Sequence, residues 1–177
     1  AVEQKLAGKE GREYRLQTAL SDLHNAYDYV IIDCPPNIGL LTFNAFLAAT
    51  EAIIPIDISY FALHGLGKLL ETAHIINKKC NHSLKINALV TNFDKRLKLS
   101  EEILEEVKRN FQENFFKTYI RTNVKLKEAI GFGKPITEYY TYCSGYRDYT
   151  SLCDEVMEGK YLKQKAQLTD QKLCAPK

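Results

Sequence analysis

The sequence lacks the short-range patterns that mark metal centres and disulfide frameworks. Its five cysteines form no C-x-x-C pair, and an odd number of thiols cannot pair completely within one chain. We therefore expect free thiols in a reducing compartment. None of the four histidines belongs to an H-E-x-x-H sequence, so we interpret them as polar or packed side chains rather than metal ligands. The net charge is only +2, so any basic binding surface must be local.

Long apolar runs are missing as well. The first fifteen residues are polar and charged throughout, so no signal peptide is recognised. The most apolar window, 38–58, contains Asn44, Glu51, Pro55 and Asp57, and Pro55 would break a helix. A helix followed by a strand fits this window better than a membrane span does. We therefore predict a cytoplasmic chain without a membrane segment.

What the sequence does contain is an alternation of strand-like and helix-like segments. Strands alternating with helices favour parallel pairing, and the expected fold is a three-layer α/β/α sandwich with a mostly parallel sheet. One domain is expected over 1–159, followed by a polar, frayed tail over 160–177. The predicted strands are 28–33, 52–57, 85–91 and 116–120. The predicted helices are 11–24, 40–49, 66–76, a helix starting at Ser100 and reaching Phe111, 125–130, and 144–158 with its end at Gly159.

One strand end carries the first candidate for chemistry. The apolar run 28–33 ends on Asp33, and Pro35-Pro36 fixes the backbone directly after it. Two interpretations are open for this carboxylate. It caps the turn that follows the strand, or it is a Walker B carboxylate that orients water on a nucleotide-bound Mg²⁺. Ligands of parallel sheets lie beyond the carboxyl ends of the strands, which places Asp33, Thr91 and Ile120-Arg121 along one edge.

Two blocks of the sequence resemble the ParA-type partition ATPases, the deviant-Walker P-loop family that also includes MinD. The first block is residues 27–66, YDYVIIDCPPNIGLLTFNAFLAATEAIIPIDISYFALHGL, which resembles the Walker B and switch II stretch. The second is residues 123–140, NVKLKEAIGFGKPITEYY, at the expected distance. The resemblance covers residues 1–158. It implies a P-loop NTPase-like fold, ATP hydrolysis with Mg²⁺ and an ATP-state homodimer.

The resemblance also implies partners and site residues. Family members bind DNA without sequence preference and work with a centromere-binding, ParB-like protein, which implies a nucleoid-associated ATPase of chromosome or plasmid segregation. Asp33 would be the catalytic carboxylate and would position Mg²⁺ through water. The nucleotide would contact Asp33 and Pro35, and its adenine would lie near Thr91, Asn92, Ile120 and Arg121. Arg121 stands where the family commonly has proline.

The largest departure from the family is the phosphate-binding loop. The family's nucleotide site begins with a K-G-G-x-G-K-T sequence, and no Gly-Lys-Ser/Thr sequence occurs in this chain. Without that loop, Asp33 has few phosphate contacts to support it. We therefore expect the chain to be the C-terminal two-thirds of a longer ATPase, with its N-terminal part missing, and to be inactive by itself.

Two basic runs are candidates for DNA contact. The first run, Lys95, Arg96 and Lys98, follows one predicted strand, and the second run is Lys117, Arg121, Lys125 and Lys127, with no acidic residue between them. Both suit phosphate contacts, and both also suit a merely solvated surface. Two other functions remain open beside partition: a MinD-like membrane-cycling ATPase, and a non-catalytic remnant that acts only through protein partners. The polar residues of 160–177 offer little apolar face for the membrane alternative.

Overall fold

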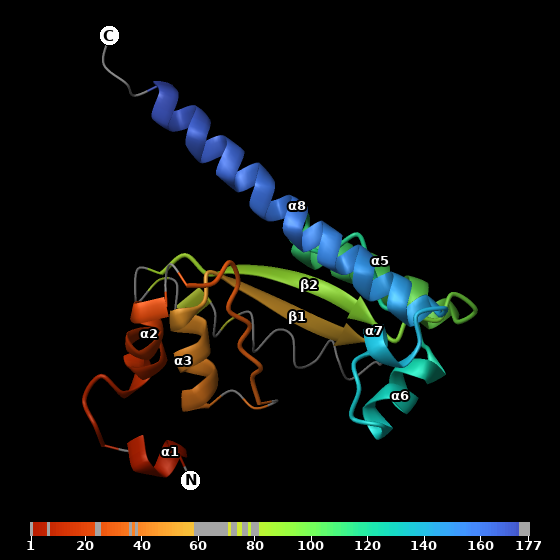
Figure 1. Cartoon of the computed structure of the whole chain (residues 1–177), viewed down its shortest axis with the longest axis horizontal. Helices are drawn as coiled ribbons and strands as arrows, with labels where there is room; N and C mark the ends of the chain where they lie inside the picture. Colours follow the sequence, from red (N-terminus) through yellow and green to blue (C-terminus); the bar gives the residue numbers. More distant parts are fainter. Residues whose placement is uncertain are drawn as a thin grey trace. The chain divides into compact units, whose positions relative to one another are not determined.

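The structure is a computed structural model of the chain (Figure 1). It describes residues 2–6, 8–23, 26–35, 37, 39–58, 71, 74–75, 78 and 82–173, with side chains described between residues 4 and 159. The chain divides into two compact units. The first unit comprises Ala1–Ile54 and Ser59–Asn87, and the second comprises Pro55–Ile58 and Ala88–Lys177. The predicted helix 66–76 lies largely outside the described residues.

Helices dominate the first unit. The predicted helix 11–24 forms as three consecutive pieces, and Gly11 precedes them with a φ of 64°, a left-handed conformation that glycine adopts without steric cost. The predicted helix 40–49 is confirmed as α3. The described helices are α1 (Val2–Leu6), η1 (Arg12–Tyr14), α2 (Arg15–Leu20), η2 (Ser21–Leu23) and α3 (Leu40–Ala48).

The buried amide of Asn44 holds α3 against η1 and α2, which lie beside it in Figure 1. Its Oδ1 accepts a hydrogen bond from the Leu16 backbone N–H at 3.1 Å, and its Nδ2 donates to the Arg12 carbonyl at 3.0 Å. A buried amide is stable only when such partners are present, and this one has them on two elements. The apolar core of the unit is the cluster of Phe46, Leu47 and Leu84.

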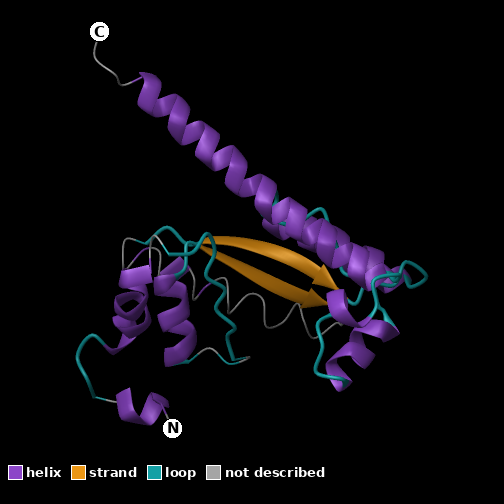
Figure 2. Cartoon of the chain, viewed as in Figure 1, coloured by secondary structure: helices purple, strands orange, loops and turns teal. Residues whose placement is uncertain are grey.

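The sheet consists of parallel strands, as the sequence predicts. β1 (Glu51–Asp57) and β2 (Lys85–Thr91) pair with each other and run in the same direction (Figures 1 and 2). Pro55 lies within β1, which fits an edge strand because proline has no N–H to donate. Residues 114–122 extend this pairing through two parallel bridges, Ala88–Phe115 and Phe93–Arg121. The predicted strand 116–120 therefore exists as bridges rather than as a regular strand.

One amphipathic helix, α5 (Lys98–Phe111), belongs to the second unit. It buries Ile103, Val107 and Phe111, three residues that its 3.6-residue repeat places on one face. The prediction that this helix starts at Ser100 is wrong by two residues. Ser100 is fully buried inside the first turn, where its Oγ accepts a hydrogen bond from the Asp94 N–H at 3.3 Å. The hydroxyl therefore accepts a hydrogen bond from the backbone N–H of the preceding turn instead of capping the helix.

Three further helices complete the second unit: α6 (Val124–Gly131), α7 (Ile136–Tyr139) and α8 (Ser144–Leu173). The side chain of Asn123 caps α6 by accepting a hydrogen bond from the Lys125 N–H at 2.8 Å. The prediction that the last helix ends at Gly159 is wrong, because α8 continues through it. One glycine costs a helix only about 1 kcal/mol relative to alanine, and good helix formers follow it.

The prediction of a buried strand over 28–33 is also wrong. These residues form no strand, and Ile31 is 93% exposed. A β-branched run becomes a strand only when a neighbour supplies hydrogen bonds and covers its face. In the described part of the chain the sheet order is β1–β2, and neither strand pairs with 28–33.

Candidate functional site

Polar side chains gather at the carboxyl ends of the parallel segments of the second unit. Asp57 ends β1, Asn92 follows β2, and Thr122 ends the adjoining segment. The Asn92 Nδ2 donates to the Asp57 Oδ2 at 2.7 Å, and the Thr122 Oγ1 donates to the Asn92 carbonyl at 2.9 Å. All three side chains are exposed, so this edge offers polar groups to a ligand in the position that α/β sheets use for binding.

The structure brings together four residues that the resemblance assigned to the nucleotide base. Thr91 ends β2 and Asn92 follows it, and the Phe93 N–H donates to the Ile120 carbonyl at 3.0 Å. Ile120 is buried, so its backbone rather than its side chain reaches this edge. Asn92 has a φ of 53°, a conformation that asparagine tolerates better than most residues. This backbone directs its side chain to Asp57.

Arg121 is held by an ion pair. Its Nε and Nη2 donate to the Asp148 carboxylate, and the carboxyl side chain of Asp148 is 9% exposed against 42% for Arg121. This hydrogen-bonded carboxylate raises the pKa of Arg121. Arg121 therefore stays charged, but its guanidinium is already shared with α8. Sequence reasoning did not identify Asp148, because nothing local in the sequence indicates a partner 27 residues away.

In the first basic run, too, a carboxylate pairs with the arginine. The Nε and Nη2 of Arg96 donate to the two carboxylate oxygens of Asp94, at 2.9 Å and 2.6 Å. The side-chain and backbone N–H groups of Arg96 lower the pKa of Asp94 to about 2. Lys95 is exposed in the same turn. This turn thus offers one lysine and one neutralised arginine.

The second basic run ends on α6. The Lys125 Nζ donates to the Glu128 Oε2 at 2.7 Å and lies 5.4 Å from the centre of the Tyr140 ring. The hydrogen bond to Glu128 raises the pKa of Lys125. Lys127 is exposed, and no ion pair to it is found among the described residues. Of the predicted DNA contacts on this run, Lys127 is the cation most available to a phosphate.

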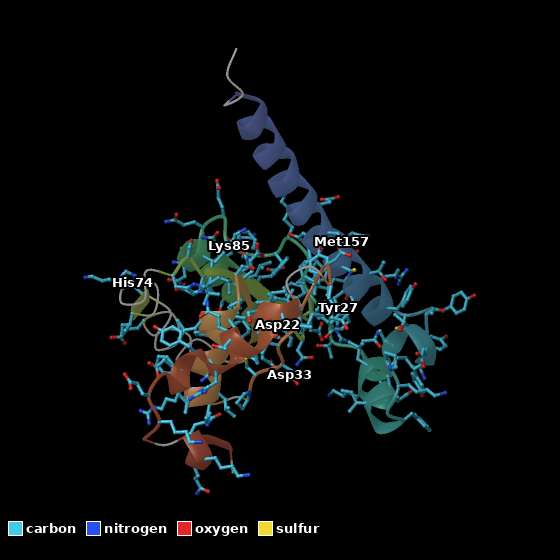
Figure 3. The ribbon with its side chains drawn as sticks, turned by 60° about the vertical axis from the view of Figure 1, so that its left-hand side comes forward. Asp22, Tyr27, Asp33, His74, Lys85 and Met157 are labelled. Carbon is cyan, nitrogen blue, oxygen red and sulfur yellow. The ribbon has the colours of Figure 1, made fainter. Side chains whose placement is uncertain are left out.

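Asp33 and Pro35 lie in the first unit, on the exposed segment 26–35 (Figure 3). Desolvation of the sulfur and the neighbouring Asp33 charge raise the pKa of Cys34, so this thiol stays protonated. No group of three or more His, Cys, Asp or Glu side chains suited to a metal occurs among the described residues. A lone exposed carboxylate fits a Mg²⁺ that is held mainly by phosphate oxygens and water.

Asp57 and Thr122 are the site residues that sequence reasoning missed. Asp57 was noted only as a polar residue in an apolar window, although it ends a strand just as Asp33 ends its apolar run. Reading every strand end, rather than one, would have found it. None of the helices that the structure describes is long and apolar enough to cross a membrane.

The sequence and the fold are similar to known nucleotide-binding and partition proteins. A family profile described as an AAA domain matches residues 1–86. A chromosome partitioning protein ParA from Myxococcus xanthus is 40% identical over 89% of this chain and 56% of its own length. The sporulation initiation inhibitor protein Soj from Bacillus subtilis is 42% identical over 86% of this chain and 63% of its own length. The chain thus spans about 56–63% of these two relatives.

A solved structure supports the architecture. Cobyrinic acid a,c-diamide synthase from Mycobacterium smegmatis, with bound ADP and magnesium, matches with a TM-score of 0.63 and 36% identity. The match covers 73% of this chain and 53% of that one. The chain is an α/β protein with the P-loop NTPase type of fold. Its sequence is similar to the ParA and Soj partition proteins along most of its length.

Proposed function

We propose that this chain forms part of an ATP-dependent partition ATPase that segregates chromosomal or plasmid DNA. The observation that carries the proposal is the identity of about 40% to ParA and Soj proteins along almost the whole chain. The polar edge formed by Asp57, Asn92 and Thr122 agrees with it, because α/β sheets bind nucleotides beyond the carboxyl ends of their strands.

The residues divide the binding task between them. Asn92 offers an amide oxygen to a purine edge while its amide nitrogen is held by Asp57, which fixes the side chain. Thr91, Ile120 and Arg121 would frame the same base. Asp33 would orient a water molecule on Mg²⁺, with Pro35 fixing the backbone beside it. Magnesium would neutralise the charge on the phosphates during hydrolysis.

The proposed cellular role rests on the similarity to ParA and Soj proteins. The ATP-bound protein would form a homodimer and bind DNA without sequence preference through Lys95, Arg96, Arg121, Lys125 and Lys127. A ParB-like protein bound at the centromere would be its partner, and the protein would be nucleoid-associated in the cytoplasm. Phosphate contacts by lysines suit such binding because they recognise the backbone and not the base sequence.

The test of the enzymatic part is ATP turnover by the complete gene product with and without Asp33→Ala. We expect turnover to fall by about 10²-fold or more, because water on the metal loses its orienting carboxylate. Asp22→Ala is the matched control, since it removes another exposed carboxylate of the same unit. Unchanged turnover in Asp33→Ala would leave this residue as a turn cap and remove it from the catalytic site.

A further inference from the structure

The surface of α6, α7 and the turn after α7 exposes an unusual number of aromatic rings. Tyr142 is 90% exposed, Phe132 is 68% exposed and Tyr140 is 42% exposed. Scattered apolar residues on a surface need no explanation, but a contiguous group of them marks an interaction site. We call Phe132, Tyr139, Tyr140 and Tyr142 the aromatic cluster.

Contacts join the members of the aromatic cluster into one surface. Phe132 stacks on Tyr139 with ring centres 5.3 Å apart, and Tyr140 meets the edge of Tyr142 at 6.3 Å. Glu128 connects the two pairs, because its Oε2 accepts hydrogen bonds from both the Tyr139 hydroxyl and the Lys125 Nζ. The Lys125 ammonium in turn lies over the Tyr140 ring. Phe132, Tyr139 and Tyr140 are therefore held in place before any ligand arrives, and Tyr142 stands exposed beside Tyr140.

The segment that carries the aromatic cluster also has an excess of positive charge. Residues 121–148 contain five Lys or Arg side chains and three carboxylates, Glu128, Glu138 and Asp148, which leaves an excess of two positive charges. Lys127, Lys134 and Arg147 are all exposed. Among the described residues, no ion pair neutralises these three cations. The surface thus combines fixed aromatic faces with available cations.

We propose that the aromatic cluster is a stacking site for unpaired bases of a single-stranded nucleic acid. Aromatic side chains bind single strands because every base has a π-face, while neighbouring cations bind the phosphates between the bases. Bases in a duplex are already stacked on one another and do not offer their faces. The cluster would therefore favour single strands, whereas isolated lysines on the same surface bind either form.

A protein partner is the competing occupant, and the chemistry of the surface favours nucleic acid. Protein interfaces are depleted in lysine and use aromatic residues for packing in closed pockets. Here lysines border the rings on α6 and in the α6–α7 connection, and Tyr142 is almost fully exposed. An excess of positive charge beside open ring faces matches a phosphate backbone that carries exposed bases.

The absence of tryptophan from the sequence makes a direct test possible. Tyr142→Trp adds one tryptophan to this part of the protein, and its fluorescence, taken as the difference from the parent protein, is quenched by a stacked base. The variant of the complete gene product is titrated, without nucleotide, with a mixed-sequence single-stranded DNA, the same sequence as RNA, and the DNA duplex. We expect strong quenching by one or both single strands and weak quenching by the duplex. The two single-stranded arms distinguish DNA from RNA as the source of the bases.

Further variants separate stacking from simple apolar contact. Tyr142→Ala and Tyr142→Leu should each weaken single-strand binding about tenfold, because neither keeps an aromatic face. Tyr142→Phe should bind as the parent does. Tyr149→Trp is the control for the reporter, since Tyr149 is a half-exposed ring of α8 outside the aromatic cluster. Because Tyr142 is exposed, thermal unfolding should be unchanged in the Tyr142 variants.

Several results would overturn the inference. Leucine that restores parental binding would show an apolar contact, and equal quenching by duplex and single strands would show that no stacking occurs. Failure of both single strands to quench the tryptophan also rejects it. The proposed partition function depends on ATP turnover and on duplex binding in the ATP state. Both can persist in Tyr142→Ala, so the two proposals fail separately.

Discussion

The carboxylate of Asp148 accepts hydrogen bonds from both the main chain and the side chain of Arg121. The backbone N–H and the Nε each lie 3.0 Å from Oδ2, and Nη2 binds Oδ1. Asp148 lies in the first turns of α8, whereas Arg121 lies in the segment 114–122 and is bridged to Phe93. One buried carboxylate therefore fixes the beginning of α8 to the parallel pairing of the second unit.

Removing this carboxylate should destabilise the protein. We expect Asp148→Asn to lower the free energy of unfolding by about 1–3 kcal/mol, since hydrogen bonds to a charged acceptor are lost in a buried place. Asp154→Asn, an exposed acid of the same helix, should change it by less than about 0.5 kcal/mol. Urea unfolding followed by circular dichroism measures both. Equal midpoints for the two variants would show that the ion pair adds nothing to stability.

The elements that sequence predicted best are those decided by local pattern. β2 was predicted with its observed bounds, and α3 and α6 within one residue at either end, because burial periodicity and caps lie within each segment. The run 28–33 failed for the opposite reason. Its β-branched residues favour a strand, but a strand also needs a neighbour, and neighbours are not encoded in the segment itself.

Two glycines of α8 should respond to alanine in opposite directions. A Cβ on Gly145 would lie 2.7 Å from Leu126 Cγ, whereas a Cβ on Gly159 would meet nothing within 4 Å. We expect Gly145→Ala to cost about 1–3 kcal/mol through overpacking. Gly159→Ala should stabilise by about 0.5–1 kcal/mol, because alanine favours the helical backbone. Thermal unfolding measures both variants. A Gly145→Ala protein that is at least as stable as the parent would contradict the predicted overpacking.

Asp94 should titrate unusually low. Its folded-state pKa is about 2, below the ordinary value of 3.8, because the carboxylate accepts hydrogen bonds from Arg96. A lowered folded pKa means that the stabilisation is present above about pH 4 and is lost as the pH falls towards 2. In Arg96→Ala we expect the pKa of Asp94 to return to about 4. NMR titration of the Asp94 carboxyl carbon measures both, and a midpoint near 4 in the parent would contradict the ion pair.

The sequence indicated where most of the candidate site lies, but not which side chains are hydrogen-bonded or ion-paired with each other there. The rule that ligands lie at the carboxyl ends of strands led to Asp33, Thr91, Ile120 and Arg121, and the resemblance added Asn92. The structure places the backbones of Thr91, Asn92, Ile120 and Arg121 together, whereas Asp33 ends no strand. The same rule gives no information about which cation is neutralised. The partners of Arg121 and Asn92 are 27 and 35 residues away in sequence, so only the fold determines them.

Some of the cations that were predicted to contact DNA are already paired with a carboxylate, and others are not. The Lys125 Nζ donates to Glu128 at 2.7 Å, and Arg121 is bound by Asp148. Lys127 is exposed on the same helix. A phosphate binds most favourably to a cation that has no carboxylate partner. If the cation is already paired, the free energy needed to break that ion pair offsets part of the new contact. Lys127 should therefore contribute more to duplex binding than Lys125.

The comparison is made with single glutamine variants of the complete gene product in its ATP-bound state. Lys127→Gln should weaken binding to any duplex about equally and lower the slope of log affinity against log salt by roughly one unit, since one phosphate contact is lost. Lys125→Gln should lower the slope by clearly less. Lys108→Gln, an exposed lysine of α5 outside both basic runs, is the control and should leave it unchanged. If the duplex affinity falls equally in the Lys125 and Lys127 variants, the ion pair with Glu128 does not restrain Lys125. If the affinity is unchanged in both variants, these lysines only solvate the surface.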